Sequence, residues 1–286
     1  MRSRESRTLV NFVNFGCNTM SLVLATQSPG EPEIFASIQG EGPSAGMPVA
    51  FLRLSRCNLA CVWCDTAYSW RFEGDNRPHR NGETFERKAN QITLDERDVA
   101  ERIAGLGQDR LVITGGEPLL QASKLAEMLK YLDTLEISRE GGSLPEDATG
   151  PRLRGDSVRI EVETNGTVDP PGSFDIRVDQ YNVSPKLSHS GNPAELALPE
   201  KLLDRWATDE RAFFKFVIAE PEDVEEVLAI QRKHAIPSRH IFLMPEGTDS
   251  ETISARERML TSLCMEHGFR LSDRLHIHLF GDTRGT

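Results

Sequence analysis

Short β-rich runs alternate with helical patterns along the chain, and this alternation restricts the fold more than any other feature. It favours parallel strands, because each parallel pair needs a crossover of the kind that a helix provides. About five or six such units are too few to close an eight-stranded barrel. We therefore expect an α/β fold, a partial β/α barrel open on one side, with the functional end at the carboxyl ends of the strands. The pattern predicts strands at 49–54, 110–114, 158–162, 180–183, 213–218 and 240–244, and helices at 94–106, 121–133, 198–206, 222–234 and 251–267.

Three cysteines, Cys57, Cys61 and Cys64, follow the first of these strands with the spacing C-x3-C-x2-C. Structural zinc normally takes four protein ligands, so this group is one ligand short. A [4Fe–4S] cluster held by three thiolates instead keeps one iron free for an outside ligand. Trp63, between the last two cysteines, is placed to shield such a cluster or to stack on a bound cofactor. We expect a cluster with an open iron; the alternatives are an incidental group of cysteines or a partial zinc site.

The chain of 286 residues is long enough for one large α/β domain or two small ones. Residues 1–30 are predicted to be an unstructured extension, within which Met20 is a possible native start, and 31–286 to be a single domain. The basic start leads into asparagines rather than the apolar core of a signal peptide. Two polar stretches, near 72–91 and 138–157, interrupt the strand–helix rhythm and are predicted to be surface insertions.

The formal net charge of −11 makes the chain a poor general binder of nucleic acid, which requires a basic surface. No run of eighteen apolar residues exists, so we expect no membrane span. Five cysteines, an odd number, favour a reducing compartment and hence a cytoplasmic protein. Cys17 and Cys264 are not candidate ligands.

A second motif, Thr114-Gly115-Gly116-Glu117-Pro118, ends the second predicted strand. Two glycines let a ligand approach the backbone closely, and a glutamate accepts hydrogen bonds from an ammonium group. Taken alone this is ordinary turn chemistry. After the cysteine motif, with each motif following a strand, it resembles the radical S-adenosylmethionine (radical SAM) superfamily. The resemblance implies that the free iron binds the methionine moiety of S-adenosylmethionine.

From about Glu33 to the C-terminus the chain resembles the 7-carboxy-7-deazaguanine synthase family, in motifs at 33–42, 51–54, 63–66, 114–118, 163–166, 184–186 and 275–286. The resemblance implies contraction of 6-carboxy-5,6,7,8-tetrahydropterin to 7-carboxy-7-deazaguanine with loss of ammonia, in queuosine and deazapurine biosynthesis, a tRNA modification pathway. The implied cofactors are a [4Fe–4S] cluster, S-adenosylmethionine and Mg²⁺. It also implies a homodimer and a reducing partner such as flavodoxin or ferredoxin.

The resemblance implies a substrate-binding set of Ile38, Gln39, Gly40, Glu41, Arg53, Thr114 and Thr286. Arg53 lies on an apolar strand, where a buried guanidinium needs an anion. That anion is the substrate carboxylate in one interpretation, and Glu41 or Glu117 in the other. Glu41 is expected to pair with the amino groups of the pterin or to orient Arg53. The terminal carboxylate at Thr286 is implied to reach the pocket.

The implied cofactor set is Trp63, Cys64, Asp65, Gly115, Gly116, Glu117, Glu163, Thr164, Asn165, Ser184, Pro185 and Lys186. The residues alone favour Asp65-Thr66 as a helix N-cap, and only the resemblance makes Thr66 a Mg²⁺ ligand. His276 and His278 alternate with apolar residues as on a half-buried strand, where histidines are more often structural.

Three other functions remain open from the sequence. One is a radical enzyme that activates a partner protein; the segment 38–42 and Arg53 favour a small pterin over it. Another is a non-catalytic iron–sulfur electron carrier or sensor, which has no need of the Gly-Gly-Glu-Pro site. The third is a zinc-stabilised binding domain.

Overall fold

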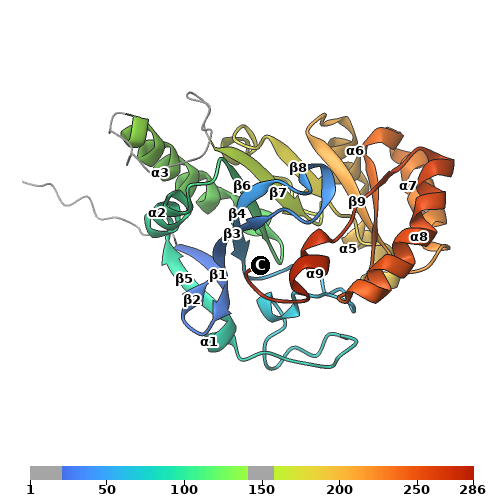
Figure 1. Ribbon diagram of the computed structural model, residues 1–286, viewed down its shortest axis with the longest axis horizontal. Coiled ribbons are helices and arrows are strands. Elements are labelled where there is room, and N and C mark those ends of the chain that lie inside the picture. The colour runs from blue at the N-terminus through green and yellow to red at the C-terminus, as the bar shows by residue number, and fades with distance from the viewer. Residues whose placement is uncertain (1–20, 141–157) are drawn as a thin grey trace, which may run out of the picture.

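The structure, a computed structural model, describes residues 21–140 and 158–286 (Figure 1). Its strands are β1 (Ser21–Ser28), β2 (Glu31–Pro32), β3 (Ile34–Ile38), β4 (Pro48–Leu54), β5 (Gln91–Asp95), β6 (Arg110–Gly115), β7 (Arg159–Thr164), β8 (Gln180–Val183), β9 (Ala212–Ile218), β10 (Ile241–Pro245) and β11 (Arg270–Leu271). Its helices are α1 (Arg87–Asn90), α2 (Glu96–Leu106), α3 (Ala122–Glu140), α4 (Gly172–Asp175), α5 (Ala194–Ala197), α6 (Glu200–Thr208), α7 (Asp223–His234), α8 (Ser250–His267) and α9 (Leu275–Phe280).

The strands form one sheet in which β4, β6, β7, β8, β9, β10 and β11 are parallel neighbours in that order. Antiparallel β1 and β3 continue it beyond β4, and β5 pairs with β1. Within the described residues no hydrogen-bonded pairing joins the two ends of the sheet. The expected α/β fold, an open partial barrel with helices outside the strands, is confirmed (Figure 1).

Alternation along the strands separates an outer apolar face from an inner face that carries both polar side chains and a small apolar cluster of Phe35, Val49, Phe51 and Val112. On β4, Leu52 and Leu54 are fully buried in the main core between the strands and the outer helices. Phe51 and Arg53 point to the inner face, and both line a cavity there. The inner face therefore presents chemistry at the strand ends while the outer face supplies the hydrophobic core.

The predicted unstructured extension is wrong from Ser21 onward. Strand β1 pairs with β4 and β5, and Leu22 and Leu24 on it are fully buried. The apolar run Leu22-Val23-Leu24-Ala25 is the local signal of this strand, and its partners β4 and β5 lie farther along the chain. Residues 1–20 lie outside the described residues.

The stretch 72–91 is irregular apart from α1 and the start of β5, and most of its residues are exposed, as expected of a surface insertion. Its base is packed, because Phe72 is buried and forms a bridge with Phe85. In the second stretch the helix α3 extends to Glu140, and residues 141–157 lie outside the part that the structure describes.

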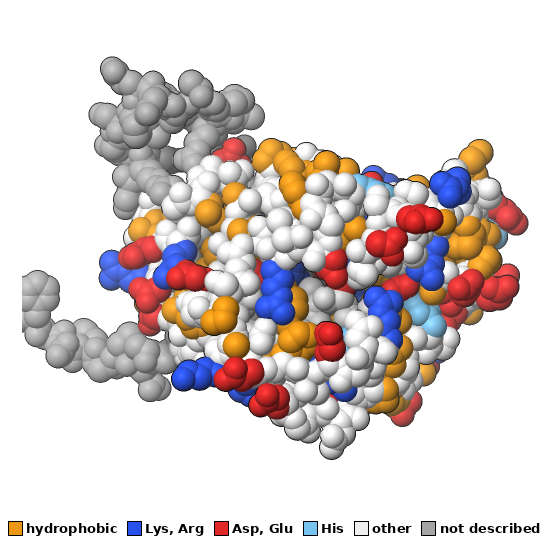
Figure 2. All heavy atoms as spheres, turned by 60° about the horizontal axis from the view of Figure 1, so that its bottom comes forward, with side chains coloured by type: hydrophobic (Ala, Val, Ile, Leu, Met, Phe, Trp, Pro, Cys, Tyr) orange, Lys and Arg blue, Asp and Glu red, His pale blue; other side chains and the backbone are white. Residues whose placement is uncertain are grey.

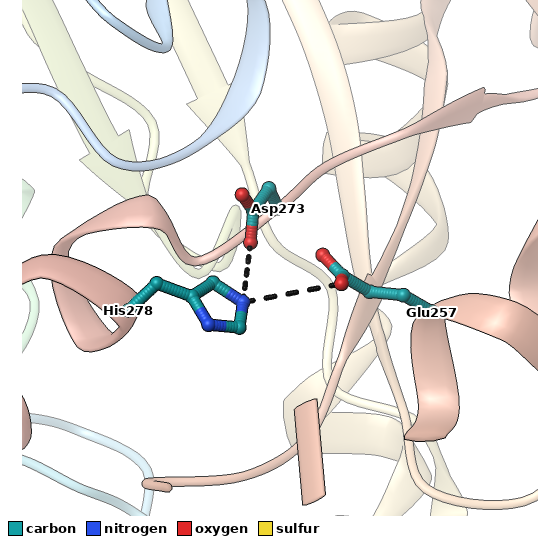
Figure 3. A group of neighbouring side chains, drawn as sticks. All are labelled: Glu257, Asp273 and His278. Atoms are coloured by element: carbon teal, nitrogen blue, oxygen red, sulfur yellow. Dashed lines mark ion pairs between the residues drawn. The ribbon is translucent and has the colours of Figure 1, made fainter. Parts of the chain in front are cut away.

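The strand expected around His276 and His278 is wrong, because Leu275–Phe280 forms the short helix α9. His278 on α9 faces Glu257 of α8 and Asp273, at 3.9 and 3.3 Å from their carboxylate oxygens (Figure 3). In Figure 1, α9 lies between the edge formed by β1 to β5 and the helices α7 and α8. The C-terminal segment thus returns across the open side of the barrel.

Across the two described ranges, every helix is too short or too polar to cross a bilayer. The face drawn in Figure 2 mixes basic with acidic side chains instead of presenting one basic surface.

Candidate active site

A cavity of about 230 Å³ opens at the carboxyl ends of the parallel strands, with the tail 282–286 in its wall. Of the predicted site residues, it is lined by Ile38, Gln39, Gly40, Glu41, Arg53, Cys57, Cys61, Trp63, Cys64, Asp65, Thr66, Thr114, Gly115, Gly116, Glu163, Thr164, Asn165, Ser184, Lys186 and Thr286. Glu117 and Pro185 are not in its lining. Residues up to 253 positions apart in the sequence, Glu33 and Thr286, thus meet in one space.

The three cysteine sulfurs face this cavity, and each lies near a separate N–H group. The side-chain nitrogen of Asn165 is 3.9 Å from the sulfur of Cys57. Asn192 Nδ2 and Trp70 Nε1 are each 3.3 Å from a sulfur, those of Cys61 and Cys64 respectively. Such donors suit sulfurs that carry negative charge as metal ligands.

The cysteines fit a cluster better than a single ion. Among the described residues, the group whose ligand atoms all lie within 4.8 Å of one another is Glu257, Asp273 and His278, and the cysteines are not gathered that closely. Burial raises the pKa of Cys57 to about 12, with the nearby Glu117 adding to the shift, and burial raises that of Cys64 to about 11. Free thiols there hold their protons, and a bound metal replaces them.

One further donor in the cavity lacks a partner. The indole N–H of Trp63 is buried without a hydrogen bond within the described residues. Buried donors are normally satisfied, so this N–H fits a site that accepts a ligand. His189 stacks on the Trp63 ring at 5.6 Å, and Lys186 Nζ lies 5.6 Å from its centroid.

The glycine loop packs against the cysteine loop through backbone alone. Gly115 has φ +142°, and a Cβ there would lie 2.1 Å from the carbonyl oxygen of Leu54. A Cβ on Gly116 would lie 2.1 Å from the carbonyl oxygen of Arg56 and 3.0 Å from Cys57 Cβ. These contacts leave no room for a side chain and fix the loop beside the cysteines.

Glu117 differs from its expected role as an acceptor for the cofactor's ammonium. Its carboxylate is fully buried and accepts from the backbone of Asn165 at 2.7 Å, the backbone of Leu119 at 3.0 Å and the hydroxyl of Thr164 at 2.8 Å. Burial raises its pKa to about 7, although these donors oppose the shift. In this structure Glu117 joins the ends of β6 and β7 and does not face the cavity.

A buried charge network forms the opposite wall. Glu41 pairs with Lys215 and with Arg274, whose other partner is Asp65. Burial alone would raise the pKa of Glu41, but Lys215 and then Arg274 outweigh it and hold this pKa far below its usual range. Arg274 likewise lowers the pKa of Asp65 against the effect of burial. His276 Nε2 lies 3.9 Å from Glu41.

Arg53 has a different partner from either one expected within the protein. Its Nε donates to Glu33 at 2.8 Å, and Tyr68 donates to the same carboxylate. Neither Glu41 nor Glu117 is its ion-pair partner. Within the described residues the two terminal nitrogens of Arg53 have no hydrogen-bond acceptor, and the residue lines the cavity.

The side chain of Gln39 makes hydrogen bonds within the cavity wall. Its amide nitrogen donates to Glu161 at 2.8 Å and to Glu163 at 3.3 Å, and it is 2% exposed. Glu163 also accepts from the hydroxyl of Thr114 at 2.7 Å. These bonds join the ends of β6 and β7 to Gln39, whose backbone N–H donates to Met47 at 2.9 Å and whose carbonyl accepts from Gly46 at 2.8 Å.

Thr66 precedes a 3-10 turn, Ala67–Ser69, but its side chain makes no capping hydrogen bond. Its hydroxyl lies 3.6 Å from the sulfur of Cys64. On the other side of the cavity, Lys186 donates to the hydroxyl of Ser184 at 2.8 Å.

Several cavity residues were not predicted: Glu33, Tyr68, Trp70, Asn182, Lys215, Arg274, His276 and Arg284. Lys215 had a signal, since it is a charge within the apolar run of β9 and is 6% exposed. Arg274 lies in a loop and offers none. The expectation that His276 is merely structural missed its place in the cavity lining.

Comparisons with known proteins agree with this geometry. The profile of the Radical SAM superfamily matches residues 52–181. The 7-carboxy-7-deazaguanine synthase of Pyrobaculum aerophilum is 35% identical over 254 residues, covering 88% of this chain and 95% of that protein. That of Hyperthermus butylicus is 32% identical over 249 residues, covering 86% and 90%.

The crystal structure of QueE from Escherichia coli has the same fold. It superposes with a TM-score of 0.55 at 21% identity, covering 87% of this chain and 93% of that one. The sequence match to the synthases extends over nearly their whole length and covers 88% of this chain, so it includes the cysteine and glycine loops. The chain belongs to the 7-carboxy-7-deazaguanine synthase family of radical SAM enzymes.

Proposed function

We propose that this enzyme converts 6-carboxy-5,6,7,8-tetrahydropterin to 7-carboxy-7-deazaguanine with loss of ammonia. One observation carries the proposal: a single cavity combines three thiols and a side-chain-free glycine loop on one side with paired charges on the other. The family membership favours this function over a protein activase or an electron carrier.

The charged side suits a pterin that carries a carboxylate. Arg53 is held at Nε by Glu33, which leaves its terminal nitrogens for a bidentate contact with that carboxylate. Ile38 and Gly40 lie in the cavity wall; the carbonyl of Gly40 accepts from Leu275 at 3.0 Å, and its N–H suits an acceptor on the edge of the ring. Glu41, kept ionised by Lys215 and Arg274, is an acceptor for amino groups.

The thiol side suits the [4Fe–4S] cluster and S-adenosylmethionine that the family implies. The bound cofactors supply the radical that removes a hydrogen atom from the substrate. The protein binds and orients the substrate and the cofactors, and it excludes water. Cys57, Cys61 and Cys64 would hold the cluster, and the Gly115-Gly116 backbone gives the methionine moiety close access. Ser184, Lys186 and Asn165 face the same space and would contact its polar groups.

We place Mg²⁺ at Thr66, whose hydroxyl does not cap the following turn. Magnesium prefers hard oxygen ligands and keeps several waters, so one hydroxyl together with substrate oxygens would suffice. Substitution of Thr66 by Val should therefore raise the Mg²⁺ concentration needed for half-maximal turnover. An unchanged requirement would contradict this placement.

We further propose a cytoplasmic homodimer reduced by a flavodoxin or ferredoxin, with its product serving tRNA modification. A reducing compartment is supported by the unpaired state of the four cysteines in the described ranges. Sedimentation analysis would test the dimer.

The deciding experiment is anaerobic reconstitution followed by incubation with dithionite, S-adenosylmethionine, Mg²⁺ and the carboxytetrahydropterin, analysed by mass spectrometry. We expect the deazaguanine acid from the wild type and none from Cys61→Ala. Formation of 5′-deoxyadenosine without this product would keep the radical chemistry and reject the pterin, leaving a protein substrate. No cleavage from a fully loaded cluster would reject both.

A further inference from the structure

Asn192 does not line the cavity, yet its side chain contacts a cluster ligand. It lies beyond the 3-10 turn Ser188–Ser190, 131 residues from Cys61 in the sequence. Its Nδ2 is 3.3 Å from the sulfur of Cys61. The neighbouring Ser190 carbonyl accepts from the backbone N–H of Val62 at 2.9 Å, so this segment supports the cysteine loop at several points.

The orientation of the Asn192 amide follows from its other partner. The backbone N–H of Ala60, which can only donate, lies 2.9 Å from Oδ1. The oxygen must therefore face Ala60, and the NH₂ group faces the sulfur of Cys61. The contact with the sulfur is thus a donated hydrogen bond.

Trp70 donates a second hydrogen bond to a cysteine sulfur, from a different part of the chain. Its indole N–H, a donor only, lies 3.3 Å from the sulfur of Cys64, and the residue is 5% exposed. The buried indole is held in place beside this sulfur, which lines the cavity.

We propose that Asn192 and Trp70 are positioning residues that raise the reduction potential of the cluster by donating hydrogen bonds to its ligand sulfurs. Reduction adds an electron, whose charge is shared with the thiolates, and donors stabilise the more negative state more strongly. The inference rests on the cluster part of the proposed function and is independent of the substrate.

The test compares Asn192→Asp with Asn192→Ala by redox titration of the reconstituted, anaerobic protein, monitored by electron paramagnetic resonance. Aspartate keeps the size of the side chain and an acceptor for Ala60, but places an oxygen where the donor was. The expected midpoint potentials fall in the order wild type, Asn192→Ala, Asn192→Asp. If Asn192 only supports the cysteine loop, the potential of Asn192→Ala should be the lowest, because only alanine removes the bond to Ala60. That order of potentials would overturn the proposal.

Trp70→Phe, which removes the donor and keeps an aromatic ring, provides an independent check and should also lower the potential. Gln108→Glu is the control, since it adds the same charge just before β6, at the end of that strand away from the cluster. Its potential should equal that of the wild type.

Iron and sulfide content is measured for every variant. Because the added charge of Asn192→Asp alone can expel iron, the donor role is decided by fully loaded Asn192→Ala, whose potential should lie below that of the wild type. Equal potentials in fully loaded proteins would overturn it without touching the proposed reaction. Absence of the deazaguanine product from a loaded wild type would instead reject the substrate and leave the order of potentials intact.

Discussion

Glu41 is the centre of the charge network in the cavity wall, because Lys215 and Arg274 both form ion pairs with it at buried positions. Removing one member of a buried ion pair leaves an uncompensated charge, which costs more than the pair itself contributes. The pKa of Glu41 is lowered, so its contribution to stability is present above its ordinary pKa of 4.5 and declines as the pH falls below that value.

We predict that Glu41→Gln lowers the free energy of unfolding by about 3 kcal/mol at neutral pH, because two buried cations lose the anion that they share, and Arg274 keeps only Asp65 and Lys215 only the more distant Glu163. The difference from the wild type should shrink below pH 4.5. Denaturant titrations followed by circular dichroism at several pH values would measure both. Glu101→Gln, in an exposed pair with Arg97, is the control and should change stability by less than about 1 kcal/mol. A similar effect of the two substitutions would contradict the network.

Gly116 sets the distance between the glycine loop and the cysteine loop, so Gly116→Ala should displace the cysteine loop. We expect a folded protein that retains less than about half of its iron after reconstitution and desalting, since the added Cβ meets the Arg56 backbone and Cys57. Iron analysis gives the answer. Gly105→Ala in α2 has open space around the new methyl group, and should retain full iron with slightly higher helix stability. Full iron in both variants would show that the loops tolerate separation.

At the scale of elements, α8 and α9 are joined by the group of Glu257, Asp273 and His278 (Figure 3). Burial and then a hydrogen bond with Asp273 raise the pKa of Glu257 to about 7. The folded protein therefore holds a proton that the unfolded chain releases above about 4.5. This contribution to stability is present at low pH and is lost as the pH rises through about 7.

Glu257→Gln should raise the melting temperature at pH 8 and leave it nearly unchanged at pH 5, because glutamine keeps a donor for Asp273 without the charge. Thermal unfolding at both pH values would measure this. Glu266→Gln, at an exposed position on the same helix, should show no such dependence on pH. A gain at pH 5 instead of pH 8 would reverse the sign that we assign.

Strand β1 supplies core packing. Leu24 is fully buried and opposite Leu54 of β4, so Leu24→Ala should cost about 3 kcal/mol of unfolding free energy. Denaturant unfolding is the measurement, with Ile176→Ala, 81% exposed, as the control within about 0.5 kcal/mol. An unchanged free energy of unfolding for Leu24→Ala would contradict this role of β1 and favour the prediction that residues up to 30 are an unstructured extension.

The parallel strands from β4 to β10 could be predicted because each is a largely buried run followed by turn residues, as in β6, which ends at Gly115. The parallel β11 was missed because its two residues are exposed. The antiparallel β3 and β5 are half-buried, and their burial depends on partners elsewhere in the chain. The same reason hid the charge network. Lys215 lies 174 residues from Glu41, and Arg274 lies 233 from it. Cysteine and glycine motifs are local, whereas the counter-charges of a cavity are not.

At the scale of the molecule, the C-terminal tail is fastened to the segment 72–91 beside the cavity. The Arg284 guanidinium lies 3.5 Å from the centroid of the Tyr68 ring and donates to Asn90 at 2.9 Å. A stacked, hydrogen-bonded guanidinium of this kind fixes the tail where it lines the cavity.

Arg284→Ala should loosen the tail and raise the KM for the pterin about tenfold, equivalent to about 1.4 kcal/mol. Hydrogen exchange at 281–286 should accelerate, while iron content and cleavage of S-adenosylmethionine without substrate stay as in the wild type. Arg239→Ala, at an exposed position, is the control. A change in iron content with an unchanged KM would show that Arg284 supports the cluster and not the binding of the pterin.

The return of the C-terminal segment across the open barrel has a consequence for biosynthesis. Arg274, which completes the partners of Glu41 and Asp65, and the tail beyond it are translated long after Cys64. While the ribosome still holds this end, the nascent chain presents its cysteines in an unfinished, accessible cavity. Iron–sulfur delivery machinery acting in this interval would meet the cysteines before the last wall is in place, and the same interval would expose the thiols to oxidants.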